Sequence, residues 1–128
     1  MIVIDASALV VAVTDTTARG YEIQDLLLDG GAAPHLVDAE VGQALRGLVL
    51  RGVLAADAAA RSLLAAYDYV THRHDHRDYL SRAWELRHNV SFYDGLYVAL
   101  AEAAGAPLVT ADRRLAAVGG VRCPVQTV

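Results

Sequence analysis

Residues 1–13 read MIVIDASALVVAV, and the pattern of these residues indicates the fold class. Residues 2–4 form a short apolar run, which is typical of a buried strand. A helix is predicted to follow at once, from Ala6 to about Val13, so that Asp5 stands where the strand passes into the helix. A strand that leads directly into a helix is the first half of a βαβ unit, whose two strands lie parallel in one sheet.

The same alternation continues along the chain. Further strands are predicted at residues 35–37, 69–73, 108–110 and 125–128. Further helices are predicted over residues 17–29, from about 40 to 51, from 57 onward, and over 76–88, 91–104 and 112–118. The helix before Gly52 has the clearest apolar stripe, at spacings of i, i+3, i+4, i+7 and i+8. We expect Asp38 and Asp57 to cap helices, and Leu80, Ala83, Trp84 and Leu86 to face inward.

This pattern predicts an α/β fold for residues 1–128 as one domain, with a central parallel sheet of four to five strands and helices on both faces. The length of 128 residues agrees with one domain. In such sheets ligands bind outside the carboxyl ends of the strands.

The composition excludes several classes of protein. Cys123 is the one cysteine, which excludes an intramolecular disulfide and a cysteine-based zinc site and fits a reducing cytosol. No apolar run approaches the roughly 20 residues of a membrane span. We therefore expect a cytoplasmic protein with no membrane partner.

The basic residues are all arginines: the 11 Lys and Arg residues include no lysine. A P-loop, a Schiff-base enzyme and a receiver domain each need a lysine, so these are excluded. The net charge of −4 is not typical of a nucleic-acid-binding protein. A phosphate-bearing partner would have to meet a metal ion or a local basic patch.

Four carboxylates lie where strands are expected to lead into helices. They are Asp5, Glu40, Asp94 and Asp112. Each one alone could be a helix cap or a favourable charge in a first helical turn. Together they would converge at one edge of the sheet and repel one another unless protonated or neutralised. Mg²⁺ or Mn²⁺ prefers such oxygen ligands, so the four predict a divalent cation site.

Four segments resemble the motifs of PIN-domain ribonucleases, and most closely those of the VapC toxins of bacterial VapBC toxin–antitoxin pairs. They are VIDASAL at 3–9, DAEVGQAL at 38–45, YDGLYVALA at 93–101 and TADRRL at 110–115. The resemblance implies that Asp5, Glu40, Asp94 and Asp112 form the catalytic metal pocket. It also implies that Ser7 and Thr110 flank that pocket. Some relatives carry a further acid where this chain has Ala116. The number of metal ions, one or two, therefore stays open.

The resemblance further implies an activity and partners. A Mg²⁺- or Mn²⁺-dependent endoribonuclease would use a metal-activated water to attack an RNA phosphodiester. A cytoplasmic, homodimeric toxin of this kind would be silenced by a VapB-type antitoxin. The alternatives are a degenerate PIN domain that only binds RNA or protein and, less favoured, a haloacid-dehalogenase-type phosphatase. The phosphatase would need an acid at position 7 and a lysine. The chain has Ser7 at that position and contains no lysine.

Basic and aromatic residues supply further candidates. Arg73 and Arg77, in HRHDHR at 72–77, and Arg113 and Arg114, next to Asp112, are candidate RNA contacts. A solvated surface or an antitoxin contact would explain these arginines as well. His72, His74 and His76 would share one face of a strand, so they are either a metal ligand set or a solvated loop. Of the two tyrosines that flank Asp94, Tyr93 and Tyr97, one is expected to pack inside and the other to reach the site.

Overall fold

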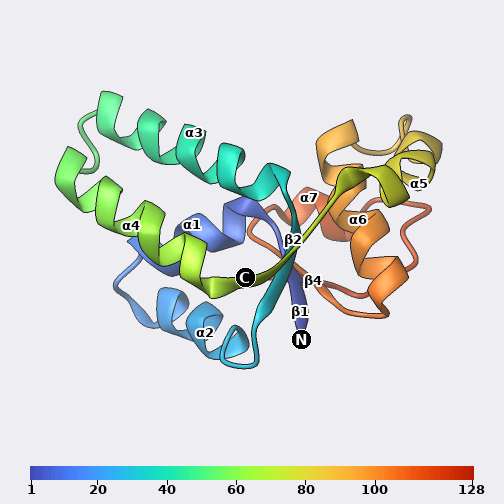
Figure 1. The fold of residues 1–128 in the computed structure, drawn as a ribbon, viewed down its shortest axis with the longest axis horizontal. Helices are drawn as coiled ribbons and strands as arrows, with labels where there is room; N and C mark the ends of the chain where they lie inside the picture. Colours follow the sequence, from blue (N-terminus) through green and yellow to red (C-terminus); the bar gives the residue numbers. More distant parts are fainter.

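The computed structural model describes residues 1–128, which are arranged around a five-stranded sheet in the order β3-β2-β1-β4-β5 (Figure 1). Every neighbouring pair of strands is parallel, so the predicted fold class is confirmed. The strands are β1 (Ile2–Ile4), β2 (Gly31–Pro34), β3 (Val70–His74), β4 (Leu108–Thr110) and β5 (Val125–Thr127). The helices are α1 (Ala6–Thr14), α2 (Ala18–Leu26), α3 (Leu36–Leu50), α4 (Ala56–Tyr69), the 3-10 turn η1 (His76–Tyr79), α5 (Leu80–Glu85), α6 (Phe92–Ala104) and α7 (Arg113–Ala116).

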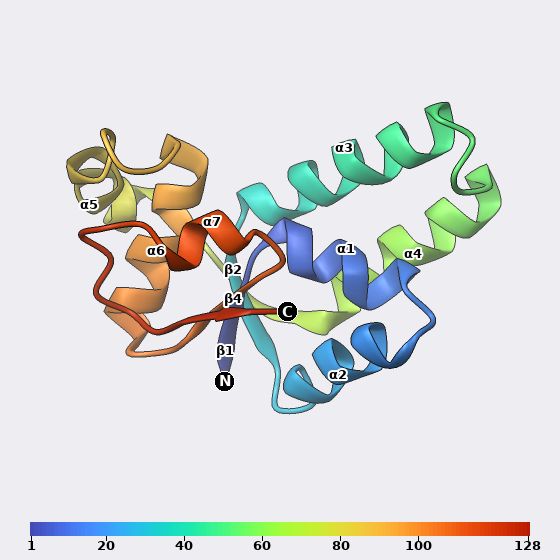
Figure 2. The ribbon, with the colours of Figure 1, turned by 180° about the vertical axis from the view of Figure 1, so that it is seen from behind.

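The helices cover the sheet in two layers, with α1 to α4 on one side and α5 to α7 on the other (Figures 1 and 2). The chain first moves outward from β1 to β2 and β3, and then returns past β1 to β4 and β5. Because crossovers between parallel strands are right-handed, this reversal moves the later helices to the opposite face. The adjacent strands β1 and β4 therefore form the switch point, where ligands bind in open α/β sheets.

The interior is built mainly on the two central strands and α6. Val3 and Ile4 of β1 and Leu108 and Val109 of β4 are fully buried. In α6 every residue from 95 to 101 is buried. Burial of one such aliphatic side chain stabilises the fold by about 1.5–3 kcal/mol. The carboxyl ends of β1 and β4 are thus held by the buried core of the molecule.

The second strand lies earlier than the sequence predicted, at Gly31–Pro34 instead of residues 35–37. All four of its residues are buried, and they are small because the neighbouring layers leave little space. A β-carbon added at Gly31 would lie 2.7 Å from Cδ2 of Leu27 and 3.2 Å from the carbonyl oxygen of Tyr69. Glycine, alanine and proline are poor strand formers, so propensity gave no sign of this strand.

Two predicted helix caps were wrong. Helix α3 begins at Leu36 after His35, and Asp38 lies in its first turn instead of capping it. Helix α4 begins after Ala55, with Asp57 in its first turn. In both helices the acid still complements the positive end of the helix dipole.

The predicted helix over residues 76–88 is also corrected. The chain forms η1 and then the short helix α5. Ala83 and Leu86 are buried as expected, but Leu80 and Trp84 are 42% and 61% exposed. A β-carbon added at Gly95 of α6 would lie 3.2 Å from the backbone and side chain of Ala83. This close approach of α5 to α6 selects the small residue for the inner face and turns Trp84 outward. No helix in this structure is both long and apolar enough to cross a membrane.

Candidate active site

Asp5 lies at the carboxyl end of β1, where it serves as the N-cap of α1. Its Oδ1 accepts hydrogen bonds from the Ala8 N–H at 3.0 Å and from the Ser7 hydroxyl at 2.6 Å. Its Oδ2 accepts one from the Thr110 hydroxyl at the end of β4. Burial raises the pKa of Asp5, and these hydrogen bonds only partly oppose the shift. The carboxylate is thus fixed in orientation, while burial still disfavours its charged form.

Glu40 reaches the same place from α3, where Tyr97 of α6 holds it. The Tyr97 hydroxyl donates to Oε1 of Glu40 at 2.7 Å, and the Tyr97 side chain is only 1% exposed. Burial raises the pKa of Glu40, and the nearby charges of Asp94 and Asp5 raise it further. Burial and the Glu40 charge also raise the pKa of Tyr97, so its hydroxyl remains a donor.

Asp94 and Asp112 complete the set from α6 and α7. Ser91 caps α6 by accepting the Asp94 N–H at 3.1 Å, which places Asp94 in the first turn. Burial raises the pKa of Asp94, as do the charges of Asp5 and Asp112. Asp112 caps α7 and binds the Arg114 guanidinium at 3.0 and 3.1 Å. This hydrogen bonding lowers the pKa of Asp112.

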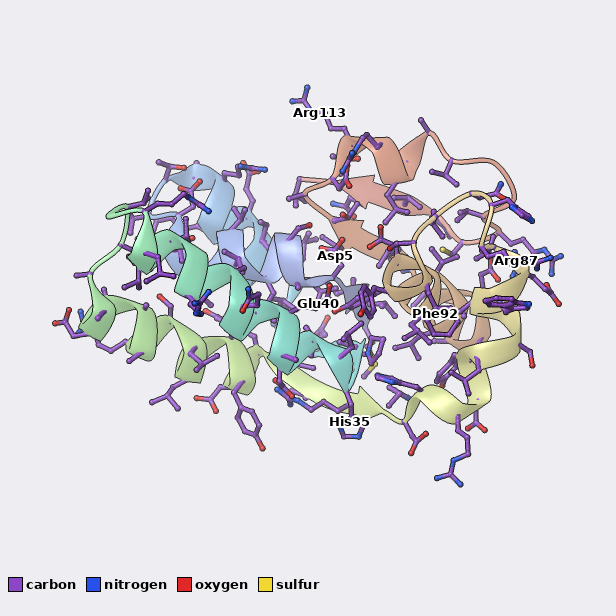
Figure 3. The ribbon with its side chains drawn as sticks, turned by 90° about the horizontal axis from the view of Figure 1, so that it is seen from above. Asp5, His35, Glu40, Arg87, Phe92 and Arg113 are labelled. Atoms are coloured by element: carbon purple, nitrogen blue, oxygen red, sulfur yellow. The ribbon has the colours of Figure 1, made fainter.

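These acids line one pocket with a volume of about 100 Å³. Its lining residues are Asp5, Ala6, Ser7, Glu40, Asp94, Tyr97 and Asp112. Figure 3 shows Asp5 and Glu40 near the centre of the molecule, between α7 and the start of α3. The structure therefore brings all four sequence-predicted carboxylates together with Ser7. Thr110 does not line the pocket, but its hydroxyl donates a hydrogen bond to Asp5.

The chemistry of the pocket suits a hard divalent cation. Its acids supply oxygen ligands, and three of them have raised pKa values that an ion would reverse. No group of three or more His, Cys, Asp or Glu side chains is arranged to hold an ion directly. The hydroxyls of Ser7 and Tyr97 and the Arg114 guanidinium bind carboxylate oxygens instead. Mg²⁺ usually keeps several waters and needs only one or two direct carboxylates, so the donor set fits it.

The arginines that are candidate RNA contacts differ in how far their guanidinium groups are exposed. Arg114 lies beside the pocket and its side chain is 91% exposed, whereas Arg113 points away from it (Figure 3). Arg77 is exposed and pairs with Asp75 at 3.4 Å. Arg73 is held within the fold: it binds both oxygens of Asp38 at 2.7 and 2.8 Å, and its side chain is only 15% exposed. The guanidinium of Arg73 is thus not presented to a ligand.

The histidines of residues 72–76 do not gather into a ligand set. Nδ1 of His72 lies 3.0 Å from the Thr71 hydroxyl, and Nδ1 of His74 lies 3.3 Å from the Tyr79 hydroxyl. Nε2 of His76 accepts the Leu36 N–H at 3.1 Å, at the first residue of α3. His76 thus satisfies a helix-start donor that no local side chain caps.

Tyr97 has two roles that we expected to be shared between Tyr93 and Tyr97. We expected one tyrosine to pack and the other to reach the acids, but Tyr97 does both. Its spacing of three from Asp94 was the available signal, because residues i and i+3 share one face of a helix. Tyr93 is 59% exposed and lines a neighbouring hollow beside Glu40.

Comparison with known proteins gives consistent matches. The family model described as PIN domain matches residues 2–121. Ribonuclease VapC1 from Mycobacterium tuberculosis is 44% identical over 128 residues, covering 98% of this chain and 96% of that protein. VapC ribonuclease Mb0985 from Mycobacterium bovis is 40% identical, covering 100% of this chain and 98% of that protein. The crystal structure of PAE2754 from Pyrobaculum aerophilum has a TM-score of 0.70 at 27% identity, covering 96% of this chain and 81% of that chain.

Proposed function

Because the chain belongs to the PIN-domain family and is a VapC-type ribonuclease, we propose that it cleaves RNA with Mg²⁺ or Mn²⁺ bound by Asp5, Glu40, Asp94 and Asp112. The observation that carries this proposal is the pocket at the β1–β4 switch point, where all four acids meet. Three of these acids have raised pKa values. We also propose that residues 1–128 act as one PIN domain.

The residues of the pocket have distinct tasks in this reaction. The cation, when bound, lowers the pKa of a coordinated water and stabilises negative charge on the phosphate. Ser7, Thr110 and the Ala8 N–H fix the orientation of the Asp5 carboxylate, which would help to hold the cation. Tyr97 holds Oε1 of Glu40, which leaves Oε2 to accept a hydrogen bond from water. Through this second oxygen Glu40 can take up a proton as general base.

Arg114 is the arginine best placed to meet the RNA backbone. It lies at the edge of the pocket in an exposed ion pair with Asp112. Exposed ion pairs contribute only about 0–1 kcal/mol, so a substrate phosphate could compete for this guanidinium. Arg113 and Arg77 are exposed as well and remain proposed contacts. We do not extend this proposal to Arg73, because Asp38 holds it within the fold.

The VapC relationship also supports proposals about partners. We propose that a VapB-type antitoxin silences the nuclease, and that the chain acts as a homodimer in the cytoplasm. A non-catalytic PIN domain is less favoured, because it would not require four acids around one pocket. A haloacid-dehalogenase-type phosphatase is excluded by Ser7, which bonds to Asp5 where that class needs an acid.

Two charge-neutral substitutions test the proposal. Asp5→Asn and Asp94→Asn should each lower Mg²⁺- or Mn²⁺-dependent cleavage of single-stranded RNA at least about a hundredfold, because each removes a negative charge that would hold the cation directly or through water. Asp68→Asn, on the exposed surface of α4, is the matched control and should cleave at the wild-type rate. Circular dichroism would verify that each variant is folded. Wild-type cleavage by both folded pocket variants would refute the assignment.

A further inference from the structure

A second hollow adjoins the acidic pocket on its α3 side. It has a volume of about 450 Å³ and is lined by Leu36, Ala39, Glu40, Gln43, Ala44 and Tyr93. Glu40 also lines the acidic pocket, so the two spaces share one wall. Ligand sites usually have volumes of about 300–1,000 Å³ and mostly apolar linings with a few polar groups. This hollow meets that description with one ring, several aliphatic groups, one amide and the Glu40 carboxylate at its shared wall.

Tyr93 is the aromatic wall of this hollow, and its ring has no partner within the protein. Some other aromatics are occupied: Tyr97 donates to Glu40, and the guanidinium of Arg73 lies 4.2 Å from the ring centroid of Tyr67. Trp84 has Arg87 over its ring at 5.1 Å. The Tyr93 side chain makes no hydrogen bond, ring contact or cation–π contact, and Tyr93 directly precedes Asp94. An exposed ring beside the acids is therefore free to stack on a ligand.

A third hollow of about 340 Å³ adjoins the acidic pocket on its α7 side. It shares Asp94 and Asp112 with that pocket, and Arg114 and Asn89 also line it. The acidic pocket thus adjoins two open spaces, one toward α3 and one toward α7. A chain with its scissile phosphate at the acids would have room for a nucleotide on either side.

We propose that Tyr93 stacks on an unpaired RNA base next to the scissile phosphate, with Leu36, Ala39 and Ala44 forming the floor of this base subsite. The proposal rests on the ribonuclease function proposed above and specifies its substrate as single-stranded at this position. Proteins recognise RNA sequence mainly where unstacked bases can lie on aromatic side chains. Paired bases inside a duplex do not offer a free face. The exposed amide of Gln43 has both a donor and an acceptor for the edge of the bound base.

Substitution of Tyr93 separates stacking from a structural role. Tyr93→Ala should raise KM for a short single-stranded RNA about tenfold and leave kcat within about twofold, because the ring binds substrate and transition state alike. Tyr93→Phe keeps the stacking face and should restore the wild-type KM. Tyr21→Ala removes a ring of similar exposure, 57%, from α2 and should leave KM unchanged. A tenfold change corresponds to about 1.4 kcal/mol, within the range for stacking of one base.

A binding measurement keeps this test independent of cleavage. In the Asp5→Asn background, an RNA with 2-aminopurine at successive positions should lose fluorescence at one of them, and Tyr93→Ala should remove that quenching. An unchanged KM in Tyr93→Ala, or equal quenching with and without the ring, would overturn the stacking proposal. So would a change of mass in sedimentation by Tyr93→Ala, which would make the hollow a contact between protein chains. Absence of metal-dependent cleavage by the wild-type protein would instead refute the proposed function.

Discussion

At the scale of single residues, the pocket holds more charge than stability alone would favour. Asp5, Glu40 and Asp94 each have a raised pKa, mainly because burial removes water from the carboxylate. Asp5 still caps α1, so one side chain serves both the helix and the pocket. The capping explanation and the metal-site explanation of these acids are therefore compatible. Without a cation, the pocket should destabilise the fold at neutral pH.

Asp94→Asn should make the metal-free protein more stable at pH 7, by roughly 0.5–2 kcal/mol, the usual size of a stabilising substitution. The raised pKa means that the folded protein binds more protons than the unfolded chain between the ordinary pKa of 3.8 and the raised one. By linkage, this carboxyl group lowers stability as pH rises through that interval. The gain from the amide should shrink as pH falls toward 4. Urea unfolding with EDTA at both pH values measures it.

Asp112→Asn is the control of opposite sign. The Arg114 hydrogen bond lowers the pKa of Asp112, so this charge stabilises the fold above pH 3.8 and its contribution is lost as pH falls through the lowered pKa. Asparagine caps helices as well as aspartate, so the change removes mainly the exposed ion pair. The variant should lose up to about 1 kcal/mol at pH 7. A loss of stability in Asp94→Asn at pH 7 would contradict our account of the pocket.

At the scale of elements, the start of α3 depends on a residue far along the chain. Leu36 begins the helix without a side-chain cap from its own neighbours, and His76 accepts its N–H across 40 residues of sequence. Because Glu40 lies one turn into α3, this contact helps to position an acid of the pocket. The HRHDHR segment thus has a structural role that neither a metal site nor a solvated loop describes.

His76→Ala should lower the free energy of unfolding by about 1 kcal/mol, since it leaves a helix-start N–H without its partner. His72→Ala is the matched control, because His72 is exposed and bonds only to Thr71 next to it. Hydrogen exchange followed by NMR should show faster exchange at the Leu36 amide in His76→Ala alone. Equal exchange at that amide in the two variants would show that His76 does not hold the helix.

The sequence predicted those elements whose signals are local. Ser91 and Gly105, the latter with φ of 61°, bound α6 as expected, and β1 and β4 were placed correctly. The elements that were predicted wrongly depend on contacts with residues far away in the sequence. At Gly31 of β2 the side chain of Leu27 leaves no room for a β-carbon, and the inner face of α5 packs against Gly95 of α6. Similarly, the positions of the four acids in the sequence motifs were enough to predict that they meet. The hydrogen bond from Tyr97 to Glu40 could be seen only in the packed structure.

At the scale of the whole molecule, the pocket joins parts that fold on opposite sides of the sheet. Asp5 follows a central strand, Glu40 belongs to the α1–α4 layer, and Asp94 and Asp112 belong to the α5–α7 layer. The reversal of strand order at β1 and β4 brings these parts to one edge. A cation bound among the four acids would therefore link both layers to the sheet, and its binding should stabilise the fold as a unit.

Mg²⁺ or Mn²⁺ should consequently raise the melting temperature of the wild-type protein at pH 7. An ion at a hundred times its Kd stabilises a folded protein by about 2.7 kcal/mol, which amounts to several degrees for a domain of this size. NaCl at equal ionic strength controls for screening between charges. Asp5→Asn should lose most of the increment, and Asp68→Asn should keep it. If the divalent ion and NaCl shift the melting temperature equally, the acids do not bind a cation specifically. A shift confined to the divalent ion, and lost on acidification as the carboxylates become protonated, would assign the binding to these carboxylates independently of any nuclease assay.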